Sequence, residues 1–215
     1  NVGTLADITA FSFHPVKGMT TGEGGAITTF DEDLLKRAKR FRNHGIETDH
    51  RQRETAGRHD YEMVELGWNY RLSDIQCALG ISQLRKLPEF LSRRRELAAA
   101  YSEAFSSISG ASPLDVMPDR KSAWHLYVVK VNPEATNKTR DEVFSQMRDA
   151  KIGVNVHYVP VHLHPFYQQK FGTSPGLCPI AEEAYSHILS LPIFPSMTAQ
   201  DQDDVTGTLN RILTD

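Results

Sequence analysis

The segment Phe11–Gly25 concentrates residues that could carry out chemistry. Ser12 and His14 stand two positions apart, and Lys17 follows just before a loop rich in glycine. A lysine partly buried at the end of a strand has a lowered pKa, and its neutral amine can form a Schiff base with a carbonyl compound. A serine hydroxyl and the amides of a glycine-rich loop suit a phosphate group. The segment therefore indicates Schiff-base chemistry on a phosphorylated ligand.

The residue types alone also fit a simpler interpretation. A lysine in a glycine-rich turn is most often a solvated surface charge. The segment is not a P-loop, because Lys17 precedes the glycines, whereas that motif has Gly-Lys-Ser/Thr at the start of a helix. Glu23 could pair with a cation in the site, and we expect His14 to support the loop rather than to act as a base.

A second polar pattern lies in the segment Gly153–Tyr167. If residues 154–158 form a strand, its period of two puts Asn155 and His157 on one face and Tyr158, with the valines, on the other. Two polar side chains that face the same way can form one wall of a ligand site. A half-exposed edge strand without a ligand explains the pattern equally well.

A metal site is the alternative use of this region, which holds His157, His162, His164 and Cys178. Zinc needs about four ligands in a tetrahedral arrangement. The His-x-His spacing is a weak signal, and His164 precedes a proline in what we expect to be a loop. We therefore predict no metal site.

The elements that would position these residues begin with two short strands. Residues 8–13 and 26–30 are β-prone, and the glycine loop joins them. A helix is expected to begin after Asp31 as its N-cap and to end before Gly45. Residues 47–60 are polar, and we expect a mobile surface loop whose length suits a lid.

Helices and strands then alternate. Capping boxes mark two helix starts, at Ser73–Gln76 and at Thr139–Glu142. The first of these helices is expected to be interrupted at Pro88, and a new one to span about 89–108. Strands are expected over Trp124–Val131 and over residues 154–158.

Buried positions follow from helical spacing. The expected core residues are Leu97, Tyr101 and Phe105 on one helix, and Val205, Leu209 and Ile212 on a last helix that Thr198 caps. Trp68, Trp124 and Cys77 are also expected to pack inside.

The composition bounds the class of protein. The 215 residues suffice for one large domain or two small ones, and 40% hydrophobic with 24% charged residues is a globular composition. A net charge of −3 gives no general attraction to nucleic acid or anionic lipid. Two cysteines make no disulfide framework. Without a run of about 20 apolar residues or a signal peptide, we expect a cytoplasmic protein.

The first residues have the character of a chain interior. Asn1 is not a start methionine, so we expect that an N-terminal portion precedes it. The texture changes after Gly110, and the long helix before it is expected to hold the domain boundary, which divides the chain into residues 1–95 and 96–215.

The motifs together resemble a known family. Phe11–Lys17 with Thr20–Ala26, Phe41–Gly45, Gly67–Asp74 and Trp124–Tyr127 resemble the DegT/StrS group of pyridoxal-phosphate-dependent sugar-nucleotide aminotransferases. The resemblance implies an α/β protein with the fold-type-I aminotransferase architecture. Residues 1–95 would form the C-terminal portion of the large, cofactor-binding domain, and residues 96–215 the small C-terminal α/β domain.

The resemblance also implies roles for three residues. Lys17 matches the lysine that bonds covalently to pyridoxal 5′-phosphate and moves the proton. Ser12 matches a phosphate ligand. Asn69, in Gly-x-Asn-x-Arg, matches a residue that reaches the cofactor phosphate of the partner subunit, which implies a homodimer with shared active sites. Relatives with histidine at the lysine position carry out dehydration instead, and Lys17 argues against that branch.

The segment Gly153–Tyr167 looks most like one subgroup of the family. That subgroup aminates C4 of a UDP-linked 4-keto-6-deoxy-N-acetylhexosamine on the pseudaminic acid pathway, with glutamate as the usual amino donor of the family. By this likeness, Asn155, His157 and Tyr158 would contact the sugar nucleotide.

Part of the family pattern falls before Asn1. The acidic partner of the pyridine nitrogen, the stacking aromatic residue and the first phosphate loop of the family precede the matched region. Two other functions therefore stay open: an inactive fragment that cannot retain the cofactor, and a binding or regulatory protein that keeps the fold without turnover. Lys17 weighs against the second.

Overall fold

The computed structural model describes residues 2–48 and 50–215, together with all their side chains except those of His50 and Arg51. The chain forms two compact units, unit 1 (Asn1–Pro88) and unit 2 (Glu89–Asp215). This division lies between Pro88 and Glu89, whereas the expected division follows residue 95. Asn1, on which the expectation of a preceding portion rests, lies outside the described residues. The assignment of residues 1–95 and 96–215 to the two domains of a larger enzyme stays a prediction.

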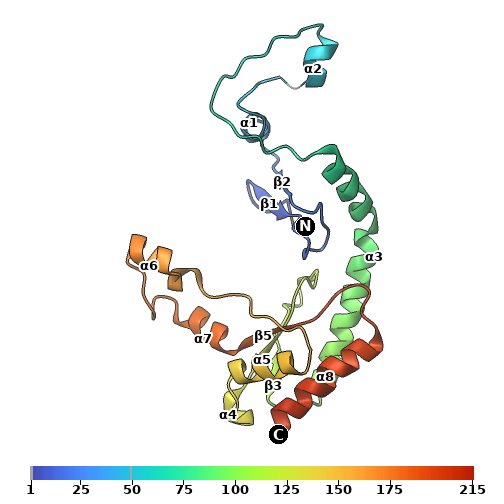
Figure 1. Ribbon diagram of the computed structural model, residues 1–215, viewed down its shortest axis with the longest axis vertical. Coiled ribbons are helices and arrows are strands. Elements are labelled where there is room, and N and C mark those ends of the chain that lie inside the picture. The colour runs from blue at the N-terminus through green and yellow to red at the C-terminus, as the bar shows by residue number, and fades with distance from the viewer. Residues whose placement is uncertain (1, 49) are drawn as a thin grey trace. The chain divides into compact units, whose positions relative to one another are not determined.

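Unit 1 begins with the expected pair of strands. β1 (Thr9–Ser12) and β2 (Gly25–Thr28) form an antiparallel hairpin in which Thr9 faces Thr28 and Ser12 faces Gly25 (Figure 1). A Cβ atom at Gly25 would lie 2.6 Å from the carbonyl oxygen of Phe11, so only glycine permits this close pairing. The hairpin thus places Ser12 at the end of β1, directly before the glycine-rich loop.

Two helices follow in unit 1. α1 (Glu32–Arg42) begins as expected at Asp31, whose carboxylate accepts hydrogen bonds from the amides of Asp33 and Leu34. The polar segment 47–60 was expected to be a loop without helix, and this is wrong, because it contains the short helix α2 (His50–Thr55). Its arginine, glutamine and glutamate side chains favour helix.

Helix α3 (Asp74–Phe105) is longer than expected. It begins at the predicted capping box, where the Ser73 amide donates to Gln76 Oε1 at 2.9 Å. The predicted interruption at Pro88 is wrong, because the helix continues through the proline. Proline removes one backbone hydrogen bond. Burial of Leu97, Tyr101 and Phe105 in the second half of the helix offsets that loss.

The sheet of unit 2 is antiparallel, in the order β3 (Ala111–Pro113), β4 (Tyr127–Val131) and β5 (Ile188–Leu191). The expected strand over 124–131 is shorter than predicted, because Trp124 has a positive φ of 49°. The expected strand over residues 154–158 is reduced to a single antiparallel bridge between Asn155 and Ser190 of β5. The register of the predicted ligand wall therefore depends on one residue of β5.

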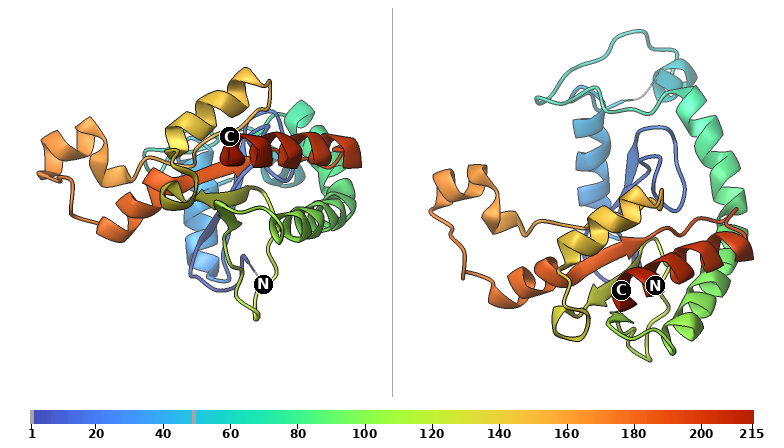
Figure 2. Two further views of the ribbon diagram at one scale, coloured as in Figure 1. Left: turned by 90° about the horizontal axis from the view of Figure 1, so that it is seen from below. Right: turned by 60° about the horizontal axis from the view of Figure 1, so that its bottom comes forward.

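Apart from α3 and the last helix, the helices described in unit 2 have ten residues or fewer. The predicted capping box at Thr139 is present, and Thr198 caps the last helix as predicted, there too in a capping box with Asp201. Figure 2 shows α8 beside α5, which it contacts most among the helices of unit 2. The helices are α4 (Pro133–Thr136), α5 (Arg140–Asp149), α6 (Pro165–Phe171), α7 (Pro179–His187) and α8 (Ala199–Thr214), with a single 3-10 turn, η1 (Val161–Leu163).

One hydrophobic core holds unit 2 together. It includes the predicted residues Leu97, Tyr101 and Phe105 of α3 and Val205, Leu209 and Ile212 of α8. The rings of Tyr101 and Tyr127 pack with their centroids 4.8 Å apart. Burial raises the pKa of the Tyr101 phenol well above its usual value. Trp124 packs partly buried against the core, as expected.

Unit 1 is different. Trp68 was expected to be a core residue but is 54% exposed, and Cys77 is exposed together with Ile81 and Leu84 on the same helix face. These predictions are wrong for this chain, because the described residues of unit 1 do not cover that face. In residues 2–48 and 50–215, no helix is long and apolar enough to cross a membrane.

The core of unit 2 predicts a clear difference between two leucines. Leu209 is fully buried in α8, whereas Leu114 is 49% exposed. We expect Leu209→Ala to lower the free energy of unfolding of the chain by about 2–5 kcal/mol, because it leaves a cavity. Leu114→Ala should change it by less than about 1 kcal/mol. Urea unfolding measures both, and equal losses would contradict the assignment of the core.

Candidate functional site

The loop between β1 and β2 fixes the backbone of Lys17. The Phe13 amide donates to the Gly24 carbonyl at 2.9 Å, which extends the hairpin, and the Thr21 amide donates to the Phe13 carbonyl at 3.0 Å. A tight turn follows, in which the Lys17 amide donates to the His14 carbonyl at 2.9 Å. The Lys17 side chain is partly buried. A primary amine is thus held on an ordered turn, as Schiff-base chemistry requires.

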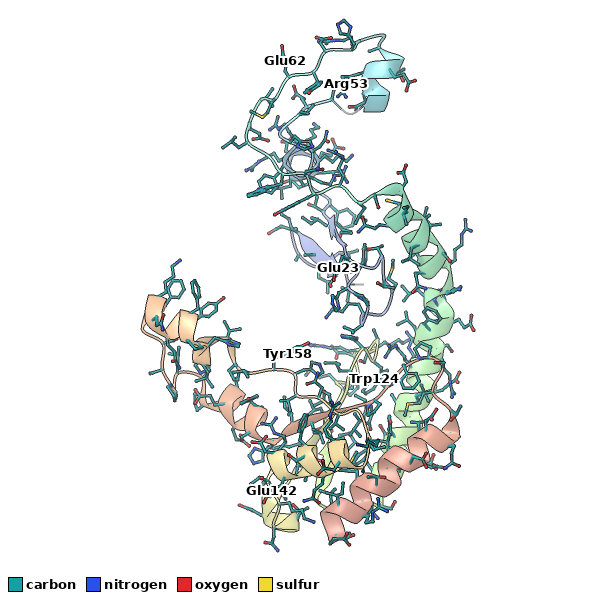
Figure 3. All side chains as sticks on the ribbon, viewed as in Figure 1. Glu23, Arg53, Glu62, Trp124, Glu142 and Tyr158 are labelled. Carbon is teal, nitrogen blue, oxygen red and sulfur yellow. The ribbon has the colours of Figure 1, made fainter. Side chains whose placement is uncertain are left out.

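The N-terminal part of α3 supports the same loop. Gln76 Nε2 donates to the Glu23 carbonyl at 2.9 Å, and the hydroxyl of the buried Thr21 donates to that carbonyl at 2.7 Å. A Cβ at Gly80 would lie 2.9 Å from the Thr21 methyl group, so glycine lets α3 approach the loop closely. Figure 3 marks the position of Glu23 in this loop.

Ser12 and His14 lie on the same hairpin as Lys17. Ser12 is exposed at the end of β1, where its hydroxyl accepts a long hydrogen bond of 3.4 Å from the His14 amide. The His14 Nε2 atom lies 3.6 Å from Glu23 Oε1. Both side chains are largely exposed, so this pair adds little stability by itself. The contact places His14 beside Glu23 on the loop, and the roles expected for both residues stay predictions.

Asn69 lies in a second tight structure of unit 1. It forms an antiparallel bridge with Asn43, and the neighbouring amides of Trp68 and Tyr70 donate to carbonyls at the end of α1. The side chain of Asn69 is exposed. The described contacts of Asn69 are with the end of α1 and not with Ser12 or Lys17. Unit 1 alone therefore does not join the three predicted cofactor residues into one site.

Glycine permits this arrangement. A Cβ at Gly67 would lie 2.1 Å from the Gly45 nitrogen and 2.9 Å from the Phe41 carbonyl oxygen. Gly45 itself has a positive φ of 71°. The guanidinium of Arg71 donates to the Asn43 side chain on the adjacent turn. The exposed rings of Trp68 and Tyr70 stack with their centroids 5.5 Å apart, so Asn69 projects from a structured surface.

The three predicted substrate residues belong to unit 2. The Asn155 amide donates to the Ser190 carbonyl at 3.1 Å, and the Ser190 amide donates back at 2.8 Å. The His157 Nδ1 atom lies 2.8 Å from Ser190 Oγ. Val154 packs in the core, but Tyr158 is 67% exposed. The prediction that Tyr158 shares the buried face with the valines is therefore wrong.

Tyr158 instead accompanies the polar pair. Its ring meets that of His157 edge to face, with the centroids 4.5 Å apart. Figure 3 shows Tyr158 and Trp124 on one side of unit 2 and Glu142 of α5 on the other. The imidazole of His157 and the phenol ring of Tyr158 thus contact each other, and Asn155 is bound through its backbone to the same serine as His157. Such groups can hydrogen-bond and stack against a polar ligand such as a sugar nucleotide.

The histidine next along the chain has a different environment. His162 is buried, and its Nε2 atom lies 2.7 Å from Glu182 Oε1. The Glu182 carboxylate also accepts hydrogen bonds from the Gly176 and Cys178 amides. These bonds, that from Gly176 first, lower the pKa of Glu182. The pair ties η1 to the start of α7 and holds both ends of the segment that carries α6 (Figure 1).

The metal site that was considered for the histidines and Cys178 of this region is not formed by the residues that the structure describes. Within residues 2–48 and 50–215, no three histidine, cysteine, aspartate or glutamate side chains stand close enough to hold a metal ion. His162 is engaged by Glu182. The prediction that there is no metal site therefore stays a prediction, with no cluster of this chain opposing it.

Two residues of these arrangements were not found from the sequence. Ser190 and Glu182 lie 33 and 20 positions from the histidines that they contact. Neither has a motif of its own. The only sequence signal is indirect, because a buried histidine needs a hydrogen-bond partner and the chain must supply one.

The comparisons with known proteins agree on one family. The sequence model of the DegT/DnrJ/EryC1/StrS aminotransferase family matches residues 1–210. The spore coat polysaccharide biosynthesis protein SpsC of Bacillus subtilis is 39% identical over 214 residues, which are 99% of this chain and 55% of SpsC. A UDP-4-amino-4,6-dideoxy-N-acetyl-beta-L-altrosamine transaminase of Campylobacter jejuni is 40% identical, over 99% of this chain and 54% of that protein.

Solved structures give the same result. The Helicobacter pylori aminotransferase PseC, which is involved in the biosynthesis of pseudoaminic acid, superposes with a TM-score of 0.88 at 31% identity. The match covers 99% of this chain and 55% of PseC. The chain thus spans about half the length of the relatives it matches.

The close backbone approach beneath Asn69 predicts that Gly67 cannot be replaced. We expect Gly67→Ala to lower the free energy of unfolding by about 1–3 kcal/mol, because the methyl group would overlap the backbone at Gly45. In the control Gly207→Ala the methyl group enters open space on α8, and it should stabilise the chain by up to about 1 kcal/mol. Urea unfolding followed by tryptophan fluorescence measures both. An unchanged Gly67→Ala variant would contradict the described turn.

The Glu182 contacts predict an acid-sensitive stability. Because the pKa of Glu182 is lowered from 4.5 in the folded chain, its ionised form stabilises the fold above that value. This contribution is lost as the pH falls through the lowered pKa. We expect Glu182→Gln to flatten the fall in unfolding free energy between about pH 5 and pH 3.

The matched control for this experiment is Glu103→Gln, at an exposed position of α3. Between about pH 5 and pH 3, the unfolding free energy of this variant should fall as steeply as that of the unchanged chain. Chemical unfolding at a series of pH values gives all three curves. Parallel curves for Glu182→Gln and the unchanged chain would rule out the role of the Glu182 hydrogen bonds.

Proposed function

Because the chain belongs to the DegT/DnrJ/EryC1/StrS aminotransferase family, we propose that the complete protein is a sugar-nucleotide aminotransferase. It transfers the amino group of glutamate to the 4-keto group of a UDP-linked 4-keto-6-deoxy-N-acetylhexosamine, in nucleotide-sugar biosynthesis of the pseudaminic acid type. It works as a homodimer in the cytoplasm. The observation that carries the proposal is the position of Lys17, a partly buried residue on the ordered turn of the β1–β2 hairpin.

The cofactor of the family is pyridoxal 5′-phosphate, a phosphorylated aldehyde. The donor groups of this chain fit it. Lys17 offers a primary amine for the aldehyde, and Ser12 offers an exposed hydroxyl for the phosphate on the same hairpin. When bound, the cofactor supplies a ring that stabilises negative charge at the carbon that loses a proton.

Side chains of unit 1 bind the cofactor and move the proton in our proposal. Lys17 would hold the cofactor through its amine, and its Nζ atom would carry the proton between the carbon atoms that lose and gain it. The backbone bonds around residues 13–24 fix the main chain from which the Lys17 side chain extends, so the loop itself loses little conformational freedom when the amine reacts. The Ser12 hydroxyl donates to the phosphate, and the exposed Asn69 amide reaches the phosphate of the partner subunit.

The substrate side belongs to unit 2. Asn155, His157 and Tyr158 hold the sugar nucleotide in our proposal, and the hydrogen bonds of the first two to Ser190 support it. The functions of the relatives favour a UDP-sugar, because one is a transaminase of a UDP-linked dideoxy sugar and another is involved in pseudoaminic acid biosynthesis. SpsC is a spore coat polysaccharide biosynthesis protein. Membership of the family therefore does not identify the sugar, and the sugar named here is part of our proposal.

A reductive trap tests the proposal directly. The complete protein is incubated with pyridoxal phosphate, reduced with borohydride and mapped by mass spectrometry. We expect a phosphopyridoxyl group on Lys17, because a Schiff base to that amine becomes a stable secondary amine on reduction. Lys17→Arg should lose the adduct and at least about a hundredfold in transamination rate, because the proton-carrying amine is gone.

Lys36→Arg is the matched control. Lys36 is an exposed lysine of α1 beside Asp33, and its variant should keep both the adduct and the rate. No adduct on Lys17 in a folded complete protein would reject the aminotransferase mechanism and leave a binding or regulatory role. An adduct in the complete protein but not in the 215-residue chain would mean that this chain alone is inactive.

A further inference from the structure

Ser190 of β5 makes contact with both polar residues of the predicted ligand wall. Its backbone exchanges two hydrogen bonds with Asn155, at 3.1 and 2.8 Å, and its hydroxyl lies 2.8 Å from Nδ1 of His157. Ser190 is only 4% exposed. The backbone bonds keep Asn155 in register, and the hydroxyl holds the imidazole ring.

Ser190 is itself held rigidly. It lies between Leu189 and Leu191, which are both buried in the core, and it faces Val128 across the β4–β5 ladder. Directly after the strand, the Tyr101 phenol donates to the Pro192 carbonyl at 2.8 Å. The serine therefore has little freedom to follow a moving histidine. The Ser190 hydroxyl therefore sets the orientation of the His157 ring.

The geometry also decides which nitrogen of neutral His157 carries the proton. A buried hydroxyl needs an acceptor for its hydrogen. Among the described residues, Ser190 Oγ has one hydrogen-bond partner, the His157 Nδ1 atom. The serine hydroxyl therefore donates and Nδ1 accepts. In the neutral ring the proton then lies on Nε2, since one ring nitrogen accepts and the other donates.

We propose that Ser190 is a positioning residue, which fixes the His157 ring with its proton on Nε2 so that this atom donates a hydrogen bond to the sugar nucleotide. The inference rests on the proposed function for the identity of the ligand. The edge-to-face contact with Tyr158 restricts the other side of the ring. Nε2–H is then matched to an acceptor, such as a carbonyl, hydroxyl or phosphate oxygen of the substrate.

The first test measures the position of the proton in the unmodified protein. The ring ¹³Cδ2 shift of histidine distinguishes the two neutral forms. His157 is assigned in the complete protein by the signal that His157→Gln removes. We expect the form with the proton on Nε2 at a pH at which the ring is neutral. The form with the proton on Nδ1 would overturn the proposal.

The second test separates positioning from simple structural support. In Ser190→Ala, the backbone bonds to Asn155 remain but the hydroxyl is lost. We expect the KM for the nucleotide sugar to rise about 3- to 10-fold, the size expected for the loss of one oriented hydrogen bond. The half-reaction with glutamate, followed by release of 2-oxoglutarate, should keep its rate, because Ser190 acts only through the sugar side.

Two further variants complete the set. Ser190→Thr keeps a hydroxyl and should restore both the Nε2 form and the KM. Ser186→Ala is the matched control, because it removes an exposed serine hydroxyl of α7 that bonds only to its own helix and its neighbour His187. It should leave the KM unchanged. Melting temperatures and circular dichroism establish that each variant is folded.

The outcomes distinguish this inference from the proposed function. If Ser190→Ala leaves the KM unchanged while His157→Gln raises it, the inference fails and the aminotransferase stands. If loss of the hydroxyl slows the glutamate half-reaction equally, Ser190 has a structural role only, and the inference fails. If the unmodified protein aminates no nucleotide sugar, the proposed function fails. The ¹³C measurement still decides whether Ser190 sets the proton of His157.

Discussion

The structure of unit 2 depends on one buried cation. The guanidinium of Arg94 donates to the carbonyl oxygens of Trp124 and His125, which precede β4, at 3.0 and 3.4 Å, and to that of Ile193, which follows β5, at 2.8 Å. Burial lowers the pKa of Arg94, yet arginine keeps its charge in proteins. A buried charge must be solvated by dipoles, so these carbonyls have to stay at the guanidinium. The same contact fastens α3 to the β4–β5 pair.

The contacts of Arg94 hold the β4–β5 pair, and this pair in turn positions the residues of the candidate ligand wall. The β4–β5 ladder aligns Ser190, and Ser190 in turn holds Asn155 and His157. Asn155 and Tyr158 remain exposed, so the polar groups are positioned from behind by buried ones. Unit 1 positions Lys17 in another way. Its loop is ordered by backbone hydrogen bonds, by glycines that admit close approach and by the side chains of Thr21 and Gln76.

The sequence predicted what is decided locally. The caps at Asp31, Ser73, Thr139 and Thr198 each use a side chain within three residues of the helix start, and all are present. Among the predictions that failed, those at Pro88, Trp124 and residues 154–158 concern positions that distant contacts decide, whereas the helix α2 was missed although its own residues favour it. Arg94, for instance, acts on a carbonyl 99 positions away. The roles of Lys17, Ser12 and Asn69 came from the family resemblance, because local physics alone favoured a solvated lysine.

The two units differ most in how their apolar side chains are covered. Every hydrophobic side chain that is buried in the described chain belongs to unit 2, from Leu97 onward. In unit 1, Trp68, Ile75 and Leu84 stay more than half exposed. Exposed apolar surface of this extent is unfavourable in water and marks a face that packs against further protein. The chain spans about half the length of its relatives, and under the proposed function the rest of the enzyme would pack on these side chains. The amine of Lys17 would then react in a drier and more confined environment than unit 1 alone provides.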